Sequence, residues 1–167
     1  MRITTGHKNQ MIELTIPGFN DHLSLTDLIL DFNGTLAIDG KMIDGVKERL
    51  VALSKVLTIH VVTGNSNGTA EEELKGIPCK IALLSPENQA KGKYQYLSHL
   101  NPASVISIGN GRNDCLLLES SAIGVIVIQE EGASVDTLSH ADIVCNSIIT
   151  ALDLIVNVRR LTATLRS

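Results

Sequence analysis

Residues able to handle a phosphoryl group stand at three places where a strand-like run of the chain ends. Asp31 follows "LIL", Thr63-Gly64 follows "TIHVV", and the acid-amide segment "GNGRND" (residues 109–114) follows "VISI". A carboxylate can attack phosphorus, because the acyl phosphate that it forms is labile. A hydroxyl group, a backbone N–H group and a lysine ammonium group can bind the remaining phosphate oxygens. These residue types therefore indicate phosphoryl-group chemistry.

The same residues supply oxygen ligands for a hard metal ion. A carboxylate and a phosphate repel each other, so a divalent cation is needed between them. Asp31, a backbone carbonyl group, Asn110 and Asp114 are candidate ligands for Mg²⁺. For the phosphate-binding ammonium group, "QAKGKYQYL" offers two lysines, Lys91 and Lys93.

The elements that must position these residues are strands that alternate with helices. Apolar, β-rich runs without polar alternation are typical of parallel strands covered on both faces. The expected strands are residues 28–32, 57–63, 80–84, 105–108, 123–128 and 142–145. Strands and helices in alternation predict a doubly wound, Rossmann-like parallel sheet with helices on both faces. Ligands bind at the carboxyl ends of the strands in such sheets, which is where the polar residues fall.

Helix signals occupy the stretches between the strands. An apolar stripe is formed by Val46, Leu50 and Leu53. A capping-box pattern at residues 69–72 starts a helix that stops at Gly76, and "SPEN" at residues 85–88 predicts another start. That second helix should end before Asn101-Pro102. The tail from residue 148 places Ile148, Leu152, Ile155 and Val156 on one face, with a weak point at Asn157-Val158.

Two short hairpins are expected outside the parallel sheet. Alternating residues 11–16 end at Pro17-Gly18 and predict an N-terminal hairpin, so residues 1–25 form an arm. Asp39-Gly40 between apolar neighbours is a strong hairpin-turn signal and predicts a small flap. The spacings from Asp31 to Thr63 and from Thr63 to Lys93 leave no room for a cap domain. We therefore expect residues 1–167 to form one domain.

Composition argues against several classes of partner. The chain has 14 Lys and Arg against 18 Asp and Glu, a net charge of −4, and 2% aromatic residues. This balance does not favour nucleic-acid binding or binding to an anionic membrane. The polar start "MRITTGHKNQ" lacks a signal-peptide pattern, no apolar run is long enough to span a bilayer, and the three cysteines have no paired spacing. A cytoplasmic location is expected.

The motifs, taken in order, resemble a known family. "DFNGT" (residues 31–35), "VVTGN" (residues 61–65), a following Lys and "GNGRND" are similar to the four motifs of the haloacid dehalogenase (HAD) superfamily. The resemblance extends from about residue 28 to about residue 155 and is strongest to the phosphorylation domain of P-type ATPases and its soluble relatives. No motif is specific alone, but the four in order at strand ends are.

The resemblance implies a role for each matched residue. Asp31 would be the nucleophile that forms an aspartyl phosphate, and Asn33 would offer its backbone carbonyl group to Mg²⁺. The strand end at Thr63, Gly64 and Asn65 would bind the phosphoryl group. Asn110 and Asp114 would complete or support the metal site. Lys93 is favoured over Lys91 because the apolar Leu97 and Leu100 follow it at the spacing seen in the family's helix.

Two residues depart from the family pattern. Typical phosphatases of the superfamily have an Asp two residues after the nucleophile, which transfers a proton; Asn33 cannot. General acid–base catalysis contributes about 10²–10⁴-fold, so hydrolysis should be slow. Asn110 stands where the family usually has Asp, and the lower charge should weaken metal binding.

Three functional hypotheses follow. The first is a Mg²⁺-dependent phosphohydrolase that works through phospho-Asp31 on a phosphorylated small molecule or a phosphoprotein. The second is a catalytically weak phosphate-binding module that regulates a partner protein. The third is a receiver-like signalling domain, although receivers carry the acceptor Asp after a later strand. A site without a cap is open to water unless a neighbouring subunit covers it, so a homo-oligomer is a further hypothesis.

Overall fold

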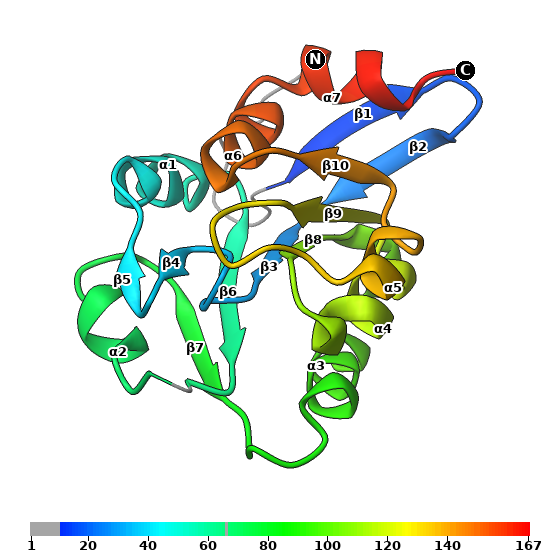
Figure 1. Cartoon of the computed structure of the whole chain (residues 1–167). Helices are drawn as coiled ribbons and strands as arrows, with labels where there is room; N and C mark the ends of the chain where they lie inside the picture. Colours follow the sequence, from blue (N-terminus) through cyan, green and yellow to red (C-terminus); the bar gives the residue numbers. More distant parts are fainter. Residues whose placement is uncertain (1–10, 66) are drawn as a thin grey trace.

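The computed structural model describes residues 11–65 and 67–167 and contains a six-stranded parallel sheet (Figure 1). The strands are β3 (Asp27–Leu30), β6 (Thr58–Thr63), β7 (Lys80–Leu83), β8 (Val105–Gly109), β9 (Ile123–Val127) and β10 (Ile143–Cys145). They lie in the order β10-β9-β8-β3-β6-β7. Because β3 is first along the chain but central in the sheet, the winding direction changes between β3 and β8. The predicted doubly wound sheet is confirmed.

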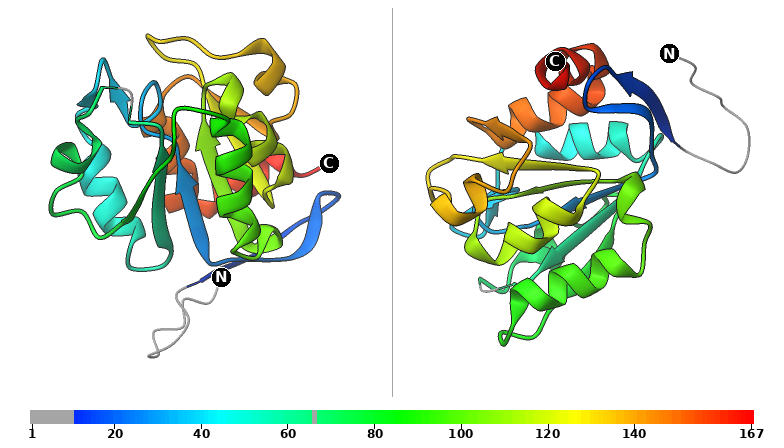
Figure 2. Two further views of the ribbon diagram at one scale, coloured as in Figure 1. Left: turned by 90° about the horizontal axis from the view of Figure 1, so that it is seen from below. Right: turned by 90° about the vertical axis from the view of Figure 1, so that its right-hand side faces the viewer.

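Helices cover both faces of this sheet. Figures 1 and 2 show α1 and α6 on one face and α3 and α4 on the other. The α-helices are α1 (Val46–Leu53), α2 (Ala70–Glu73), α3 (Gln89–Ser98), α4 (Cys115–Ser120), α5 (Val135–Leu138), α6 (Ile148–Val156) and α7 (Val158–Leu165), with 3₁₀ turns η1 (Pro102–Ser104) and η2 (Arg112–Asp114). No helix within residues 11–65 and 67–167 is long and apolar enough to cross a bilayer.

The core follows from the apolar runs in the sequence. All five residues of β8 and of β9 are buried, as expected for parallel strands that lie between two helical layers. Helix α1 buries its predicted stripe, Val46, Leu50 and Leu53. In α6, Ile148, Leu152 and Ile155 are buried. The predicted fourth member of that face is wrong, because Val156 is 55% exposed at the end of the helix.

The N-terminal hairpin is formed by β1 (Ile12–Ile16) and β2 (Asn20–Leu25), which pair antiparallel. It packs beside α7, where the backbone N–H of Ser167 donates to the carbonyl group of Pro17 at 3.1 Å (Figure 1). The hairpin leads directly into the amino end of β3 and therefore lies at the end of the sheet opposite the polar strand ends. Residues 1–10, which include the polar start, lie outside the described residues.

Two predicted helix starts are wrong in detail. The segment at residues 85–88 is a loop, and α3 begins only at Gln89, after Asn88 adopts a left-handed conformation with φ 56°. The predicted capping box does not form at α2, because the Thr69 hydroxyl group donates to the carbonyl group of Gly40 at 2.5 Å instead. The second difference arises from a contact with a distant part of the chain, which a local pattern does not reveal.

The predicted flap is confirmed as β4 (Ala37–Ile38) and β5 (Lys41–Met42), joined at Asp39-Gly40. Its backbone is fastened to the body on two sides. The N–H group of Met42 donates to Glu73 Oε2 at 2.8 Å, and the N–H group of Asp39 donates to Glu131 Oε1 at 2.9 Å. Within the described residues no further domain is inserted beside it, which agrees with the expected lack of a cap.

Candidate active site

The polar strand ends meet at the point where the sheet changes its winding direction. Leu30, the last residue of β3, is in register with Val61 of β6 and Ile108 of β8. The next residue, Asp31, donates its backbone N–H to the Ile108 carbonyl group at 3.0 Å. Three strands therefore deliver their carboxyl ends to one edge, which is where a doubly wound sheet binds ligands.

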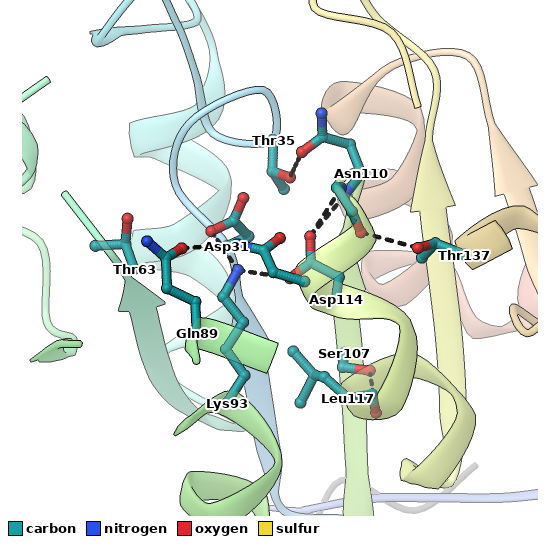
Figure 3. A network of polar contacts seen from close by, with 12 residues as sticks. Asp31, Thr35, Thr63, Gln89, Lys93, Ser107, Asn110, Asp114, Leu117 and Thr137 are labelled. Carbon is teal, nitrogen blue, oxygen red and sulfur yellow. Dashed lines mark hydrogen bonds and ion pairs between the residues drawn. The ribbon is translucent and has the colours of Figure 1, made fainter. Parts of the chain in front are cut away.

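Lys93 lies between two acidic side chains at this edge of the sheet. Its ammonium Nζ lies 2.7 Å from Asp31 Oδ1 and 2.6 Å from Asp114 Oδ1, and the lysine is completely buried. Figure 3 shows the lysine reaching from α3 to the two carboxylates. A buried charge is tolerated only when it is paired and hydrogen-bonded, so these three side chains depend on one another.

Asp114 supports the loop that follows β8. Its second oxygen, Oδ2, accepts the backbone N–H groups of Asn110 at 3.1 Å and of Gly111 at 2.9 Å (Figure 3). Both carboxylate oxygens are thus engaged, one by Lys93 and one by the backbone. Asp114 therefore holds the lysine and shapes the loop, while the Asp31 carboxylate is held by Lys93 at Oδ1 and by a hydrogen bond from the Phe32 backbone.

The charges in the site shift the acid–base behaviour of its members. Burial raises the pKa of Asp31 to about 6; the negative charge of Asp114 acts in the same direction, and Lys93 opposes it. For Lys93, burial acts to lower the pKa, but the charges of Asp114 and Asp31 outweigh it and raise the pKa to about 12. At neutral pH the lysine is therefore protonated, and most Asp31 side chains are ionised.

A pocket of about 210 Å³ opens beside Asp31, and its lining is polar or glycine throughout. The lining residues are Asp31, Asn33, Thr63, Gly64, Gln89, Asn110, Gly111, Asn113 and Glu131. This size suits a phosphate group with a small alcohol attached. The polar lining provides hydrogen bonds and lacks the apolar surface on which an aromatic base would stack.

The predicted phosphate-binding strand end divides into two parts. Thr63 and Gly64 line the pocket. Asn65 does not: its side-chain oxygen accepts the backbone N–H of Ala70 at 3.1 Å, and its own backbone N–H donates to Thr63 Oγ1 at 2.9 Å. The structure therefore places Asn65 as a cap for the first turn of α2 that also orients the threonine.

The two candidate lysines are separated clearly. Lys93 lies against Asp31, as favoured from the sequence, whereas Lys91 is exposed and does not line the pocket. Lys91 and Lys93 are two positions apart on α3. Each position turns the helix by about 100°, so the two side chains point in directions that differ by about 200°. Lys91 is therefore not brought to the site.

The two asparagines that depart from the family pattern both reach the pocket. Asn33 Oδ1 accepts a hydrogen bond from Asn67 Nδ2 at 2.9 Å. Asn110 donates from Nδ2 to the carbonyl group of Gly132 at 3.0 Å, and its Oδ1 accepts from the Thr35 hydroxyl group at 3.2 Å. The Gly132 carbonyl group can only accept, so it determines which way the Asn110 amide points.

The residues present fit a hard divalent ion held by few protein ligands. Asp31, the Asn110 amide oxygen and the predicted Asn33 carbonyl group offer oxygen donors around one pocket, and Mg²⁺ commonly keeps several waters. Asp114 would support this set through Lys93 and the loop. In the described part of the chain, no group of three or more His, Cys, Asp or Glu residues is arranged to hold a metal ion. The ligands would therefore be mainly neutral oxygens.

Four pocket residues, Gln89, Gly111, Asn113 and Glu131, were not singled out from the sequence. Asn113 Nδ2 donates to Gln89 Oε1 at 2.8 Å, which joins the start of α3 to the loop after β8. A Cβ atom on Gly64 would collide with the Gln89 amide, so the glycine lets this side chain lie against the strand end. Glu131 comes from the loop after β9. Isolated amides and acids at helix starts, in short turns and in loops look like ordinary surface residues, and no local signal distinguishes them.

Solved structures of HAD-superfamily phosphatases share this fold. The 3-deoxy-D-manno-octulosonate 8-phosphate phosphatase of Moraxella catarrhalis, crystallised with magnesium, phosphate and KDO, covers 80% of this chain and 86% of its own, with TM-score 0.60 and 15% identity. The cobalt-bound deoxy-D-mannose-octulosonate 8-phosphate phosphatase of Haemophilus influenzae covers 86% and 94%, with TM-score 0.61 and 12% identity. A HAD phosphatase from Bacteroides thetaiotaomicron covers 83% and 96%, with TM-score 0.60 and 13% identity. The chain therefore has the HAD-superfamily fold.

Two archaeal proteins are related to the chain in sequence. Uncharacterized protein MJ0073 of Methanocaldococcus jannaschii is 50% identical over 62 residues, which are 37% of this chain and 67% of that protein. Uncharacterized protein MJ0072 of the same organism is 42% identical over 40 residues, which are 24% of this chain and 91% of that protein. The chain belongs to one family with these proteins. No family model matches it.

Proposed function

We propose that this protein is a metal-dependent phosphohydrolase whose nucleophile is Asp31. The observation that carries the proposal is the arrangement of Asp31: one of its oxygens is held by Lys93 at 2.7 Å, and the side chain lines a polar pocket next to Thr63 and Gly64. A carboxylate held by one oxygen can present the other to an electrophile. The structural resemblance to HAD phosphatases supports the same chemistry.

In the first step, an Asp31 oxygen would attack the phosphorus of a phosphate monoester. The new bond is the acyl phosphate P–O bond, and the bond that breaks is the ester P–O bond. The leaving alkoxide takes its proton from water, because the Asn33 amide has none to transfer. Thr63 and Gly64, which line the pocket, would hold the phosphoryl oxygens during this step, and Lys93 would hold the Asp31 carboxylate in place.

In the second step, water would attack the aspartyl phosphate, which releases inorganic phosphate, restores the carboxylate and frees one proton. No carboxylate stands at position 33 to accept that proton, so this step should be slow. Bound Mg²⁺ would neutralise phosphate charge next to Asp31. The slow second step predicts that a phosphorylated form of the protein accumulates during turnover.

A catalytically weak module that binds phosphate and regulates a partner remains the second candidate. It is favoured by the neutral amides Asn33 and Asn110, which remove a proton carrier and a metal charge from the site. A receiver-like domain is less consistent, since the candidate nucleophile follows β3, the first strand of the parallel sheet. We also propose, from the sequence alone, that the protein is a single domain, is cytoplasmic, forms homo-oligomers and is related to P-type ATPases.

The proposal is tested by hydrolysis of an aryl phosphate with Mg²⁺ and with a chelator. Wild-type protein should release phosphate only with the metal, and Asp31→Asn should abolish the release. Asp21→Asn, an exposed carboxylate on β2 at the far end of the sheet, is the matched control and should retain it. Equal turnover by wild type and Asp31→Asn would contradict the proposal.

A further inference from the structure

Part of the pocket lining comes from residues outside the predicted motif positions. These residues are Gln89, Asn113 and Glu131, which we call the rim. The lining, as far as the described residues define it, includes no Lys, Arg or His side chain. A group attached to the phosphate would therefore meet two amides and one carboxylate. Such a border accepts hydrogen bonds and attracts positive charge.

Glu131 is held in place at the rim. Its Oε1 accepts the backbone N–H of Asp39 at 2.9 Å, which ties the side chain to the tip of the flap. Among the described residues no group donates to Oε2. The side chain is exposed, and no described cation forms an ion pair with it. One carboxylate oxygen is thus fixed by the flap, and the other remains able to interact with a ligand.

The nearby cation cannot balance this charge. Lys93 is completely buried and already contacts two carboxylates, Asp31 and Asp114. The catalytic cluster of these three groups carries a net charge of −1 when all are ionised, by adding one positive and two negative charges. Glu131 adds a further negative charge on the outer side. Whatever charge a bound Mg²⁺ supplies at Asp31, a second anionic group on the part of the ligand beside Glu131 would be repelled by this carboxylate.

We propose that Glu131 is a specificity-determining residue that selects phosphate monoesters of small amino alcohols and disfavours those of hydroxy acids. The inference rests on the proposed phosphohydrolase function and adds the substrate class. The phosphoryl group occupies the inner pocket at Asp31, Thr63 and Gly64. The ammonium group of the alcohol part then lies at Glu131 Oε2, and the two rim amides contact its hydroxyl or ester oxygens.

The size of the effect follows from the exposure of Glu131. An ion pair in contact with water changes an equilibrium by roughly two- to fivefold. Attraction of an ammonium group and repulsion of a carboxylate add, so together they separate the two esters by about tenfold in kcat/KM. Salt screens such pairs, so the ratio should decrease as NaCl is added.

The test compares three monophosphate esters of similar size, those of ethanolamine, ethylene glycol and glycolic acid. Wild-type kcat/KM should be highest for the ethanolamine ester, intermediate for the glycol ester and about tenfold lower than the first for the glycolate ester. Glu131→Gln preserves an oxygen for the Asp39 N–H but removes the charge, and it should bring the three within about twofold. Glu130→Gln, an equal charge change outside this pocket, should keep the wild-type ratio.

Binding of the three esters to Asp31→Asn, measured by calorimetry, separates this inference from the proposed function. Affinities that decrease from the ethanolamine ester to the glycol ester to the glycolate ester support the role of Glu131. If wild type shows this order but no turnover, only the phosphohydrolase function is contradicted. Equal affinities and equal kcat/KM values in wild type overturn the role of Glu131 while hydrolysis stands. An unchanged ranking in Glu131→Gln also overturns it.

Discussion

Replacing Lys93 with Met would leave two buried carboxylates without the cation between them. The Nζ atom lies 2.7 Å from Asp31 Oδ1 and 2.6 Å from Asp114 Oδ1, and both Lys93 and Asp114 are fully buried. Removing one partner of a buried ion pair costs about 3–5 kcal/mol, because the charge that remains is uncompensated. We expect the free energy of unfolding at pH 7.5 to fall by about this amount.

The loss should become smaller in acid. The pKa of Asp31 is already raised to about 6 with the lysine present, and removal of the lysine raises it further. The folded variant therefore binds a proton more strongly than the unfolded chain does. Stability of Lys93→Met then increases as the pH falls toward 5, with about 1.4 kcal/mol for each unit of pKa difference that is titrated.

Urea unfolding at pH 7.5 and pH 5 measures both effects. Lys91→Met, on the same helix but exposed, is the control and should change the free energy by less than about 0.5 kcal/mol. The double variant Lys93→Met/Asp31→Asn removes one of the two facing charges and should recover part of the loss at pH 7.5. A cost below about 1 kcal/mol at both pH values, with no recovery in the double variant, would refute the reasoning.

Three further predictions concern other residues. Asn33→Asp, which supplies a proton carrier at the pocket, should increase aryl phosphate turnover by about 10²–10⁴-fold, and an unchanged rate would contradict the role assigned to the missing acid. Gln89→Ala removes an amide that lines the pocket and lies against Gly64. It should raise KM for phosphate esters by about three- to tenfold in steady-state kinetics. An unaltered KM would contradict a contact between this amide and the ester. Burial lowers the pKa of His60, whose ring nitrogens lie 2.8 Å from Asp27 Oδ1 and 2.8 Å from the Tyr96 hydroxyl group. As the pH falls, the unfolded chain therefore binds a proton at His60 before the folded protein does. The free energy of unfolding of wild type should decrease below about pH 6.5, and that of His60→Gln should decrease less. Equal pH dependence of the two proteins in urea unfolding would contradict this prediction.

Residues that act through their place at a strand end could be predicted from the sequence. Asp31, Thr63, Gly64, Asn110 and Asp114 follow buried parallel strands, and such strands all end at the same edge of a doubly wound sheet. The apolar runs determine that register, because a buried strand has few ways to satisfy both its side chains and its backbone. The position of each polar residue relative to its strand is therefore sufficient to predict that these residues lie at one edge of the sheet.

Residues that act through contacts between loops could not be predicted in the same way. Gln89 reaches the pocket because α3 starts three residues later than "SPEN" predicted, after a loop that ends in the left-handed Asn88. Thr69 has the sequence of a helix cap but bonds to the flap at Gly40. Glu131 is positioned by the backbone of Asp39, 92 residues away along the chain. These partners are distant in sequence, so no local pattern contains them.

The central claim is that Asp31 becomes phosphorylated. Wild-type protein would be mixed with Mg²⁺ and an aryl phosphate, quenched in acid during turnover, digested, and analysed by mass spectrometry beside Asp31→Asn. We predict one added phosphoryl group on the peptide that contains Asp31 in wild type, and none in the variant. Phosphate release by wild-type protein with no phosphorylated form of that peptide, or the same modification in Asp31→Asn, would contradict the account.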